Sequence, residues 1–317
     1  MSNDYQKDKM NFDVIIIGGG AAGISAALWC DELNLKTLLL EAGGELGGQL
    51  LRVYNPIKNH LGIETKNGRE LRDIFVRQIE NRQFTVFLQS EICSVDLQKK
   101  SVALDSGEKF FAAAIIVATG VRRRKLNVEG EEKFIGKGIV ESGKRDADSV
   151  RDKNVCIVGG GDAAFENALI LAETAKSVLL IHRQTNFRAR AEFIEQVANN
   201  PKIKILTETI VRKIIGGERV EAVALENLST EKIFVKDVEA ILLRIGVEPN
   251  TDFLNGELEL DKHGYIVVNQ ICETNIKGIY AVGDVANSVA PTVSSAVGMG
   301  ATAAKAIFAR LNIQREF

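Results

Sequence analysis

Two glycine-rich turns of one design lie in this chain of 317 residues, and each follows a short apolar run and precedes an alanine-rich stretch. The first turn spans residues 18–23 and the second spans residues 159–164, and both fit the pattern G-x-G-x-x-G/A. The first glycine of the pattern allows a tight turn, the second lets backbone approach a pyrophosphate, and the third position must be small so that helix and strand pack closely. The unpaired N–H groups of the helix N-terminus then face the phosphates. The pattern predicts two dinucleotide sites, with contributions from Gly18, Gly20, Ala22, Gly23, Gly159, Gly161, Asp162, Ala163 and Ala164.

A carboxylate ends the apolar run that follows the first turn. Glu41 lies 23 residues after Gly18 (41 − 18), directly after residues 36–40. A carboxylate at this position accepts hydrogen bonds from the ribose hydroxyls of a bound dinucleotide. The first turn therefore predicts a nucleotide with an unphosphorylated adenosine ribose, as in FAD. The alternative is that Glu41 only solvates the end of a strand.

The equivalent position after the second turn is basic. His182 lies 23 residues after Gly159 (182 − 159), and Arg183 and Arg188 follow it. No carboxylate is present to repel a 2′-phosphate, and guanidinium groups bind phosphates well, so the second turn favours NADPH. Gln184 stands where related NADPH sites often carry a second arginine, which leaves NADH, or a ligand that is not a nicotinamide nucleotide, open. An ordinary charged surface loop would also explain the two arginines.

The composition is that of a globular enzyme. Apolar residues make up 45% and charged residues 26% of the chain, which is enough to bury more than one core. The net charge of −2 gives no general attraction to nucleic acid or to an anionic membrane. Residues 1–9 are polar and lack the apolar centre of a signal peptide, and no apolar run has the length of a membrane span. We therefore expect a cytoplasmic protein that binds neither nucleic acid nor membrane.

The sequence periods that are typical of strands and helices occur in the same order in two successive parts of the chain. They predict an α/β chain with two Rossmann-like three-layer dinucleotide-binding domains. Between about residues 84 and 111, short alternating runs with a turn at 105–107 indicate antiparallel strands. Residues 121–130 are predicted to be a linker. Helices are predicted over 21–33, 68–82, 163–175, near 191–198 and from about 298, and buried strands over 114–117, 177–181 and 240–243.

An ordered set of short motifs gives the chain a family resemblance over nearly its whole length. It resembles the low-molecular-weight thioredoxin reductase family of flavoproteins, which have the FAD/NAD(P)-binding fold. No single motif is decisive, but their order is specific. The motifs are the turn 18–23, Glu41, Gly47-Gly48-Gln49, Ala118-Thr119-Gly120, the turn 159–164 with Glu166, His182-Arg183, Gly246 with Pro249-Asn250-Thr251, and Gly283-Asp284.

The resemblance implies a discontinuous FAD domain over residues 1–121 and 250–317, with an NAD(P) domain inserted over 122–249. It also implies a homodimer. Gly48 and Gln49 would lie along the FAD, and Asp284 would bond its ribityl or pyrophosphate region. The family often has Asn-aromatic-Pro-Gly beside the flavin, where this chain has residues 59–62, so His60 is either a proton donor near the flavin or an incidental loop histidine. Further FAD contacts implied in this way are Asn59, Ala118, Thr119, Gly120 and Gly283.

The chain departs from the family at the redox centre. Members that reduce disulfides carry Cys-x-x-Cys shortly before the second glycine turn, where one thiolate attacks the substrate disulfide and the other resolves it. Here Ser142 and Arg145 stand where the two cysteines would be, so the usual dithiol relay is absent. Two cysteines distant in sequence would have to meet in the fold to replace it. The four cysteines of the chain are Cys30, Cys93, Cys156 and Cys272.

Without a dithiol, electrons must leave the flavin directly. The chain is therefore predicted to be an FAD-dependent NAD(P)H oxidoreductase whose acceptor is a ferredoxin, a flavodoxin or a small oxidant. A cysteine-free branch of the family is similar to ferredoxin/flavodoxin-NADP reductases. The basic run 122–125 either docks an acidic carrier protein or is a solvated linker. The C-terminal extension often seen in that branch is missing or reduced to residues 313–317, where Phe317 either stacks on a flavin or belongs to a frayed terminus.

The sequence leaves two alternatives open. The protein could have kept FAD without turnover and act as a redox or nucleotide sensor, or it could reduce disulfides with thiols that a partner supplies. The retained glycines of the second turn argue against the sensor, and no residue supports the supplied thiols. The sequence leaves the acceptor and the direction of electron flow undetermined.

Overall fold

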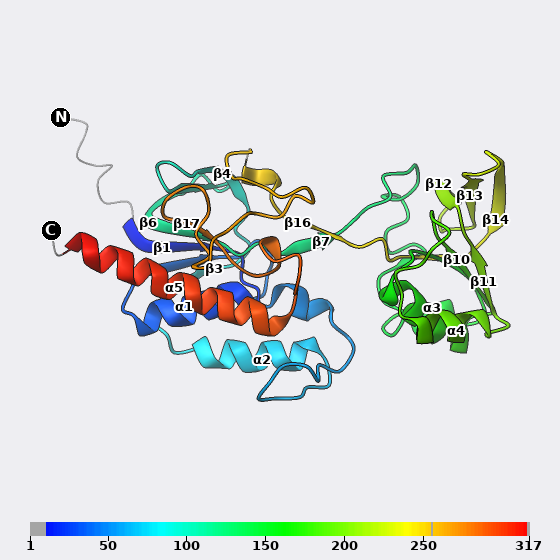
Figure 1. Ribbon diagram of the computed structural model, residues 1–317, viewed down its shortest axis with the longest axis horizontal. Helices are drawn as coiled ribbons and strands as arrows, with labels where there is room; N and C mark the ends of the chain where they lie inside the picture. The colour runs from blue at the N-terminus through cyan, green and yellow to red at the C-terminus, as the bar shows by residue number, and fades with distance from the viewer. Residues whose placement is uncertain (1–10, 255, 316–317) are drawn as a thin grey trace. The chain divides into compact units, whose positions relative to one another are not determined.

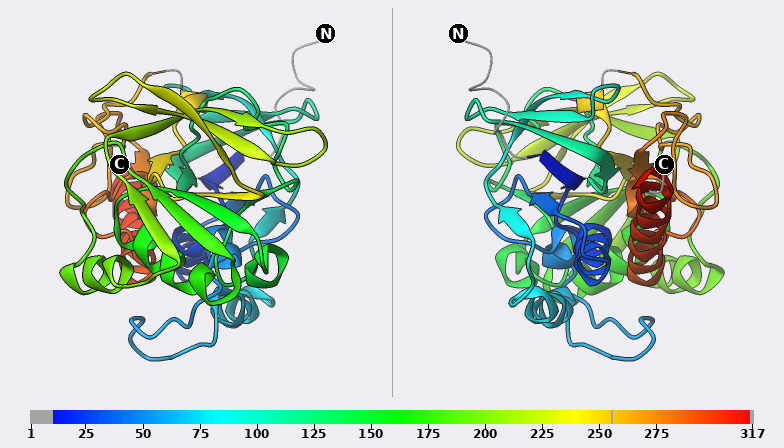
Figure 2. Two further views of the ribbon diagram at one scale, coloured as in Figure 1. Left: turned by 90° about the vertical axis from the view of Figure 1, so that its right-hand side faces the viewer. Right: turned by 90° about the vertical axis from the view of Figure 1, so that its left-hand side faces the viewer.

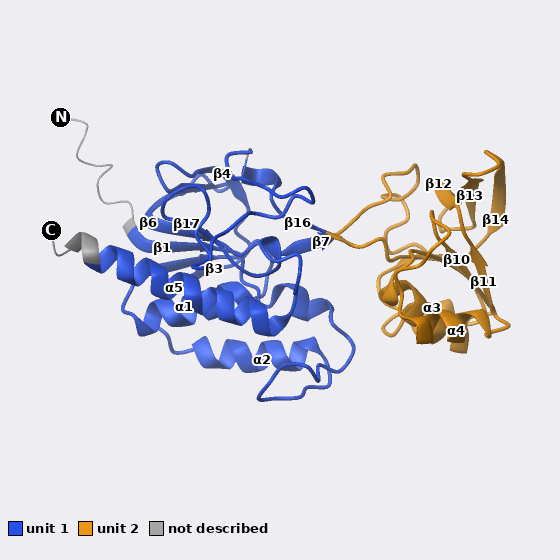
Figure 3. Ribbon diagram, in the orientation of Figure 1, with its two compact units in different colours: residues 1–122, 248–317 blue, residues 123–247 orange. Residues whose placement is uncertain are grey.

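The computed structural model describes residues 11–254 and 256–315 of the chain. The polar segment 1–9 and Phe317, which entered the predictions above, lie outside the described residues. The chain divides into two units, of which unit 1 lies within residues 1–122 and 248–317 and unit 2 within residues 123–247 (Figure 3).

A seven-stranded sheet forms the centre of unit 1 (Figure 1). Its strands have the order β3-β2-β1-β6-β5-β4, and β17 pairs with the second half of β6, on the edge whose first half pairs with β5. Strands β1, β2, β3, β6 and β17 are parallel, while β4 and β5 are antiparallel additions. The strands are β1 (Asn11–Ile17), β2 (Thr37–Leu40), β3 (Thr85–Phe87), β4 (Ile92–Asp96), β5 (Ser101–Leu104), β6 (Lys109–Val117) and β17 (Ile279–Ala281).

Alternate side chains of β1 reach two different cores, which explains why its sequence is apolar throughout. Val14 and Ile16 pack on helices α1 (Ala21–Glu32) and α5 (Val293–Arg315), which contact each other on one face of the sheet (Figure 2). Ile15 and Ile17 face the other side, where they share a core with side chains of β4, of β5 and of the chain around residues 254–266. Helix α2 (Gly68–Ile79) completes the helical layer beside α1.

Unit 2 repeats the three-layer plan around a five-stranded parallel sheet of order β11-β10-β9-β15-β8. Val155 and Ile157 of β9 pack on helices α3 and α4, while Cys156 and Val158 face a three-stranded antiparallel sheet. The parallel strands are β8 (Ile139–Val140), β9 (Asn154–Val158), β10 (Ser177–Ile181), β11 (Ile203–Leu206) and β15 (Ala240–Leu243). The helices are α3 (Asp162–Thr174) and α4 (Ala191–Ala198), and the antiparallel strands are β12 (Thr209–Ile215), β13 (Ala222–Asn227) and β14 (Ile233–Asp237).

The chain passes twice between the units, at residues 122/123 and 247/248. Strands β7 (Val121–Arg123) and β16 (Val247–Pro249) pair with each other at these passages. Four short 3-10 helices complete the described elements, namely η1 (Gly48–Arg52), η2 (Ala147–Val150), η3 (Asp252–Leu254) and η4 (Gly283–Val285).

The structure confirms the predicted α/β class with two Rossmann-like units, and it corrects several elements. The last helix begins at Val293, five residues before the predicted start (298 − 293), because the Thr292 side chain caps it by accepting the backbone N–H of Ser295 at 3.2 Å. Strand β3 pairs in parallel with β2, whereas residues 84–111 were expected to be antiparallel throughout. Helix α2 ends at Ile79 rather than Arg82, and the expected linker 121–130 contains strand β7.

Candidate functional site

A cavity of about 620 Å³ lies in unit 1 at the first glycine turn, and we call it the glycine-turn cavity. Its lining includes the residues that directly follow β1, β2 and β6, at the carboxyl edge of the parallel strands, where ligands of open α/β sheets bind. Its volume is in the range of ligand pockets. Eleven predicted residues line it, namely Gly18, Gly20, Ala22, Glu41, Gly48, Gln49, Ala118, Thr119, Gly120, Gly283 and Asp284.

Gly23 is a packing residue of the turn rather than a lining residue. A Cβ atom added to Gly23 would lie 1.9 Å from the carbonyl oxygen of Gly18. A Cβ added to Gly20 would meet nothing closer than the Cα of Gly48 at 3.9 Å. The third glycine therefore lets α1 pack on the turn, while the second leaves space at the cavity wall.

Glu41 is held in place at the end of β2 by the backbone of two loops. Its Oε2 accepts the N–H of Gly19 at 2.7 Å, and its Oε1 accepts the N–H of Gly43, also at 2.7 Å. Each carboxylate oxygen keeps a second acceptor position. The carboxylate is therefore oriented, and it can still accept hydroxyl donors from the cavity.

The middle of the cavity wall depends on a pair of residues that lie 131 positions apart. The Thr119 hydroxyl donates to the carbonyl oxygen of Asn250, and Asn250 Nδ2 donates to the carbonyl oxygen of Thr119, both at 2.8 Å. Gln49 Nε2 donates to the carbonyl oxygen of Val121 at 2.7 Å. Asn250 itself lines the cavity, as do Arg52 and Thr292, and sequence reasoning assigned no site role to these three.

Asp284 is the carboxylate that fits a ligand most directly. It is part of η4, lines the cavity and has no hydrogen-bond partner among the described residues. Burial raises the pKa of its carboxyl group above the usual value. Since a desolvated carboxylate is stabilised by donors, the hydroxyl groups of a ribityl chain or ribose would satisfy it, and the residues present fit FAD.

Asn59 and His60 do not line the glycine-turn cavity. His60 Nδ1 lies 3.1 Å from the hydroxyl oxygen of Ser294, and its ring packs edge-on against Phe75. Ser294 adjoins Val293, which does line the cavity, so His60 lies close to the border of the cavity. A contact of Asn59 or His60 with FAD stays a prediction.

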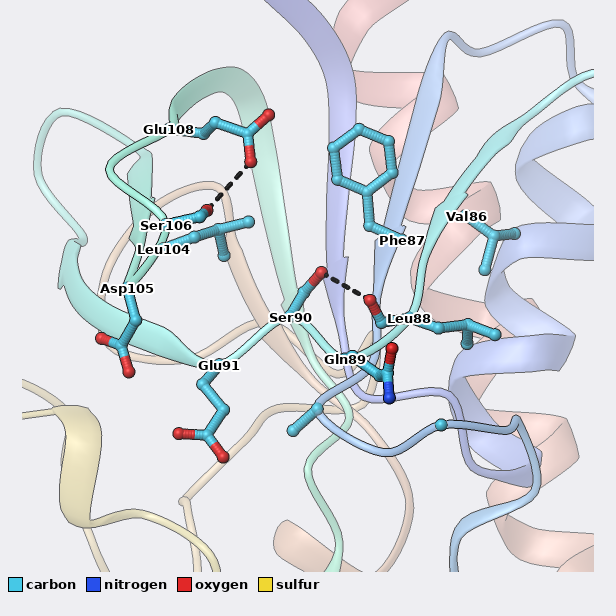
Figure 4. Close-up of a pocket in the computed structure, with 12 residues that line it drawn as sticks. Val86, Phe87, Leu88, Gln89, Ser90, Glu91, Leu104, Asp105, Ser106 and Glu108 are labelled. Atoms are coloured by element: carbon cyan, nitrogen blue, oxygen red, sulfur yellow. Dashed lines mark hydrogen bonds between the residues drawn. The ribbon is translucent and has the colours of Figure 1, made fainter.

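A second, larger hollow of about 770 Å³ lies elsewhere in unit 1, along β3 and the turn between β5 and β6 (Figure 4). Its lining carries the carboxylates of Glu91, Asp105 and Glu108 but no lysine or arginine. The Ser106 hydroxyl donates to Glu108 at 2.9 Å. The phosphates of a dinucleotide would meet negative charge there, so the glycine-turn cavity is the better candidate although it is smaller.

In unit 2 the second glycine turn is closed on one side by His182. A Cβ added to Gly160 would lie 2.3 Å from Cε1 of the imidazole. His182 Nε2 lies 3.1 Å from the carbonyl oxygen of Asn186. Burial lowers the pKa of His182 below its ordinary value; the hydrogen bond to Asn186 opposes this shift, and the charges of Arg183 and Arg188 add to it.

Arg183 and Arg188 are exposed, and among the described residues neither side chain has an ion-pair or hydrogen-bond partner. The backbone N–H of Arg188 donates to the carbonyl oxygen of Gly160 at 2.8 Å, which holds this loop at the turn. Arg190 is instead paired, because its Nε contacts the carboxylate of Asp162 at 3.2 Å. The two free guanidinium groups are thus available to a phosphate.

The remaining predicted residues of this turn divide by burial. Ala164 is buried in the core beneath the turn, whereas Ala163 and Asp162 are exposed on the first turn of α3. A Cβ added to Gly161 would meet nothing within 4 Å. Gly161, Asp162 and Ala163 are therefore accessible to a ligand, and Ala164 packs the helix on the sheet.

Ser142 and Arg145 lie in the loop that follows β8, and this loop is fixed by one carboxylate. Asp146 Oδ2 accepts the backbone N–H groups of Glu141 at 2.8 Å and Ser142 at 3.0 Å. The Arg145 guanidinium contacts both oxygens of Asp146, at 2.6 and 2.9 Å. Burial alone would raise the pKa of Asp146, but these donors outweigh it and the pKa is lowered. The loop therefore holds an ion pair between Arg145 and Asp146, and its correspondence to the dithiol of the family stays a prediction.

All four cysteines are free thiols. Burial raises the pKa of Cys30 to about 12 and that of Cys272 to about 11, and it raises the pKa of Cys156 still further. The thiolate is the reactive form of a cysteine, so these three are unreactive near neutral pH. Cys93 is exposed on β4 without a second cysteine to pair with.

The part of the chain that the structure describes holds no cluster of three or more histidine, cysteine or acidic residues able to bind a metal ion. None of the described helices is long and apolar enough to cross a membrane. Glycine turns at the carboxyl edges of two parallel sheets, one in each unit, define a protein with two dinucleotide sites. This class includes the flavin-dependent oxidoreductases of pyridine nucleotides.

Comparison with known proteins places the chain within that class. The model of the pyridine nucleotide-disulphide oxidoreductase family matches residues 12–300, and the chain belongs to this family. The thioredoxin reductase of Mycolicibacterium smegmatis is 35% identical over 295 residues, which cover 92% of this chain and 94% of that protein. An alkyl hydroperoxide reductase component of Pseudomonas putida is 30% identical over 96% of this chain and 60% of its own length.

A solved structure gives the same answer for the fold. The crystal structure of Lactococcus lactis thioredoxin reductase superposes with a TM-score of 0.82 at 30% sequence identity, covering 94% of this chain and 98% of that one. The chain is thus an NAD(P)H-flavin oxidoreductase of the thioredoxin reductase-like type, and membership of the family implies FAD and NADPH as its cofactors.

Proposed function

We propose that this oxidoreductase passes electrons from NADPH through FAD to an acceptor other than a dithiol of its own chain. In this proposal unit 1 is the FAD domain and unit 2 the NAD(P) domain. The glycine-turn cavity supports the first assignment, and the free Arg183 and Arg188 beside the second glycine turn support the second. Bound FAD would supply hydride acceptance and the release of electrons singly or in pairs.

The residues of the chain bind and orient the two nucleotides in this scheme. Glu41 accepts the adenosine ribose hydroxyls of FAD, and Asp284 accepts hydroxyl donors from its middle. The turn 159–164 and the N-terminus of α3 take the pyrophosphate of the second nucleotide, because the backbone N–H groups there point at it. Arg183 and Arg188 would bind a 2′-phosphate and so select NADPH over NADH.

The observation that carries the acceptor proposal is the loop after β8. In this proposal Ser142 and Arg145 stand at the positions that the family resemblance gives to the dithiol, and the structure supports it in that the Arg145 guanidinium is bonded to Asp146. The three buried cysteines are held as thiols by their raised pKa. A ferredoxin, a flavodoxin or a small oxidant therefore fits the site better than a disulfide that needs an enzyme thiolate to attack it.

The basic run 122–125 offers less to an acidic carrier than its sequence suggests. Arg122 forms ion pairs with Glu248 at 2.9 Å and Asp252 at 2.6 Å, and Lys125 pairs with Glu132 at 3.2 Å. We keep docking of a carrier protein at this run as a proposal, which is tested by comparing carrier proteins with small oxidants. The proposed assembly is a homodimer, to be measured by light scattering of the FAD-loaded protein.

Anaerobic stopped-flow absorbance of the FAD-loaded protein tests the function. NADPH is expected to bleach the flavin faster than NADH does, and oxidised ferredoxin, flavodoxin or a small oxidant is expected to restore the absorbance. The variant Cys93→Ser is the matched control and is expected to keep the full rate, because the exposed thiol has no role. Oxidation of the reduced flavin by thioredoxin disulfide alone would contradict the acceptor proposal. Absence of bleaching by either nucleotide would contradict the hydride path.

A further inference from the structure

Arg244 occupies a special position in the sheet of unit 2. It directly follows β15, and in the strand order β11-β10-β9-β15-β8 the chain reverses direction across the sheet between β9 and β15. Leu243 is in register with Val158, so Arg244 stands beside Gly159, the first glycine of the turn. A Cβ added to Gly159 would lie 2.3 Å from the carbonyl oxygen of Arg244. Ligands of open parallel sheets bind at the carboxyl edge at such a reversal.

The guanidinium of Arg244 is held across this edge by neutral acceptors. Its Nη1 donates to the carbonyl oxygen of Leu243 at 2.8 Å, and its Nη2 donates to the carbonyl oxygen of Glu141, which follows β8, at 2.7 Å. Nη2 also lies 3.5 Å from Oδ1 of Asn167 on α3. No carboxylate of the described residues forms an ion pair with it. Its Nε–H and one Nη1–H are left without a partner in these bonds.

The strand order indicates which half of the bound nucleotide would lie near Arg244. On one side of the glycine turn, after β10, lie His182, Arg183 and the free Arg188. The adenosine half of the nucleotide would bind on that side. The pyrophosphate lies at the turn itself, between β9 and the N-terminus of α3. The other half must then cross to the opposite side, over the ends of β15 and β8. Arg244 and the loop that starts at Glu141 lie on that side.

We propose that Arg244 is a specificity-determining residue of the second nucleotide site, whose fixed positive charge favours the neutral reduced nicotinamide ring over the cationic oxidised ring. The inference rests on the proposed binding of a nicotinamide nucleotide in unit 2 and goes beyond it. Attraction between the guanidinium and the phosphates is the same for both redox forms. Only the ring changes its charge, so the effect of Arg244 shows in the ratio of the two affinities.

The surroundings of Arg244 are charged, but they do not change how the ratio of the two affinities depends on the charge at position 244. The guanidinium interacts electrostatically with the carboxylates of Glu141, Asp146 and Glu166, and Arg123 adds a second cation. Burial lowers the pKa of Arg244 to about 10, so the group stays protonated at pH 7. Since the same neighbours surround every substituted side chain at position 244, a change in the affinity ratio reports the charge at 244.

The test measures two dissociation constants on the FAD-loaded protein by calorimetry. One ligand is NADP⁺, and the other is a tetrahydro analogue of NADPH, whose ring is uncharged and donates no hydride. Arg244→Gln removes the charge and keeps an amide that can donate to the Glu141 carbonyl, whereas Arg244→Lys keeps the charge. We expect Arg244→Gln to shift the affinity ratio about tenfold toward NADP⁺, which corresponds to about 1.4 kcal/mol, and Arg244→Lys to keep the wild-type ratio.

The outcomes separate this inference from the proposed function. If wild-type protein binds both ligands and Arg244→Gln leaves their ratio unchanged, the inference is wrong while the function stands. An equal shift in Arg244→Gln and Arg244→Lys would also overturn it, because the guanidinium shape rather than the charge would then matter. If neither ligand binds wild-type protein, the function itself fails. Arg183→Gln is the control on the adenosine side, where both affinities are expected to fall and the ratio to stay constant.

Discussion

Gly20 and Gly23 of the first turn allow the effects of packing and of ligand contact to be tested separately. Substitution of Gly23 by alanine places a Cβ 1.9 Å from the carbonyl oxygen of Gly18, so α1 must move away from the turn. Substitution of Gly20 by alanine meets no atom closer than 3.9 Å, and the backbone there is extended (φ −76°, ψ −174°), which alanine tolerates. Gly20→Ala is therefore expected to fold normally and to place a methyl group at the cavity wall.

The expected magnitudes differ for the two variants. Overpacking of a tight contact costs about 1–3 kcal/mol, so Gly23→Ala is expected to lose stability of this size as well as FAD. Gly20→Ala is expected to keep the free energy of unfolding of the FAD-free protein within about 0.5 kcal/mol. Its methyl group occupies space that a pyrophosphate approaches closely, and we expect FAD to bind about tenfold more weakly or worse, a loss of about 1.4 kcal/mol.

The assay combines urea unfolding of FAD-free protein with titration of FAD by flavin fluorescence. The decisive result is that of Gly20→Ala, because its fold is intact. Wild-type FAD affinity in this variant would refute the assignment of the glycine-turn cavity to FAD. Normal stability of Gly23→Ala would refute the packing argument for the third position of the fingerprint.

Three further outcomes follow from the site. Gly161→Ala has open space around its Cβ, so it is expected to weaken NADPH binding about tenfold while FAD content stays at the wild-type level, as calorimetry and flavin absorbance will measure. The double variant Arg183→Gln/Arg188→Gln is expected to reduce the preference for NADPH over NADH. The NADH affinity is expected to stay unchanged, since NADH lacks the 2′-phosphate. An equal loss of affinity for both nucleotides would contradict the assignment of these arginines to the 2′-phosphate. The lowered pKa of His182 means that the folded protein binds a proton there less readily than the unfolded chain. The free energy of unfolding therefore falls as the pH drops below the ordinary histidine value of 6.5, and His182→Gln is expected to remove this part of the fall in urea titrations at pH 5 to 8.

The glycine turns could be predicted from the sequence because their chemistry is local. Each turn lies within six consecutive residues, and Glu41 and His182 follow at the end of the next strand, so spacing alone places them. The class of fold followed from the same repeats. The capping side chain Thr292 was missed, so the last helix was predicted to begin at about residue 298 instead of at Val293.

Contacts between segments that are distant in the sequence could not be predicted from it. Thr119 and Asn250 exchange two hydrogen bonds across 131 residues, and only the fold brings them together. In the sequence Arg244 is one charged residue after a predicted strand. Only the structure shows that its guanidinium donates a hydrogen bond to the Glu141 carbonyl oxygen. The parallel pairing of β3 depends on its neighbour β2 rather than on its own three residues. Such pairings are set by tertiary context, which short patterns do not encode.

Unit 1 is built from two segments of the chain that are separated by unit 2, and this order affects how the protein folds during synthesis. Strand β17, helix α5 and Asp284 are translated after the whole of unit 2, yet they complete the sheet that begins with β1 and the cavity that begins at Gly18. Unit 2 can fold on the ribosome as soon as residue 247 emerges, because all its strands are then present. Until β17 and α5 are made, the amino-terminal part has one edge of the second half of β6 unpaired, and its helical layer lacks α5. Cofactor loading is therefore a late event of biosynthesis, and a prematurely terminated chain would retain the first glycine turn without the wall that closes over it.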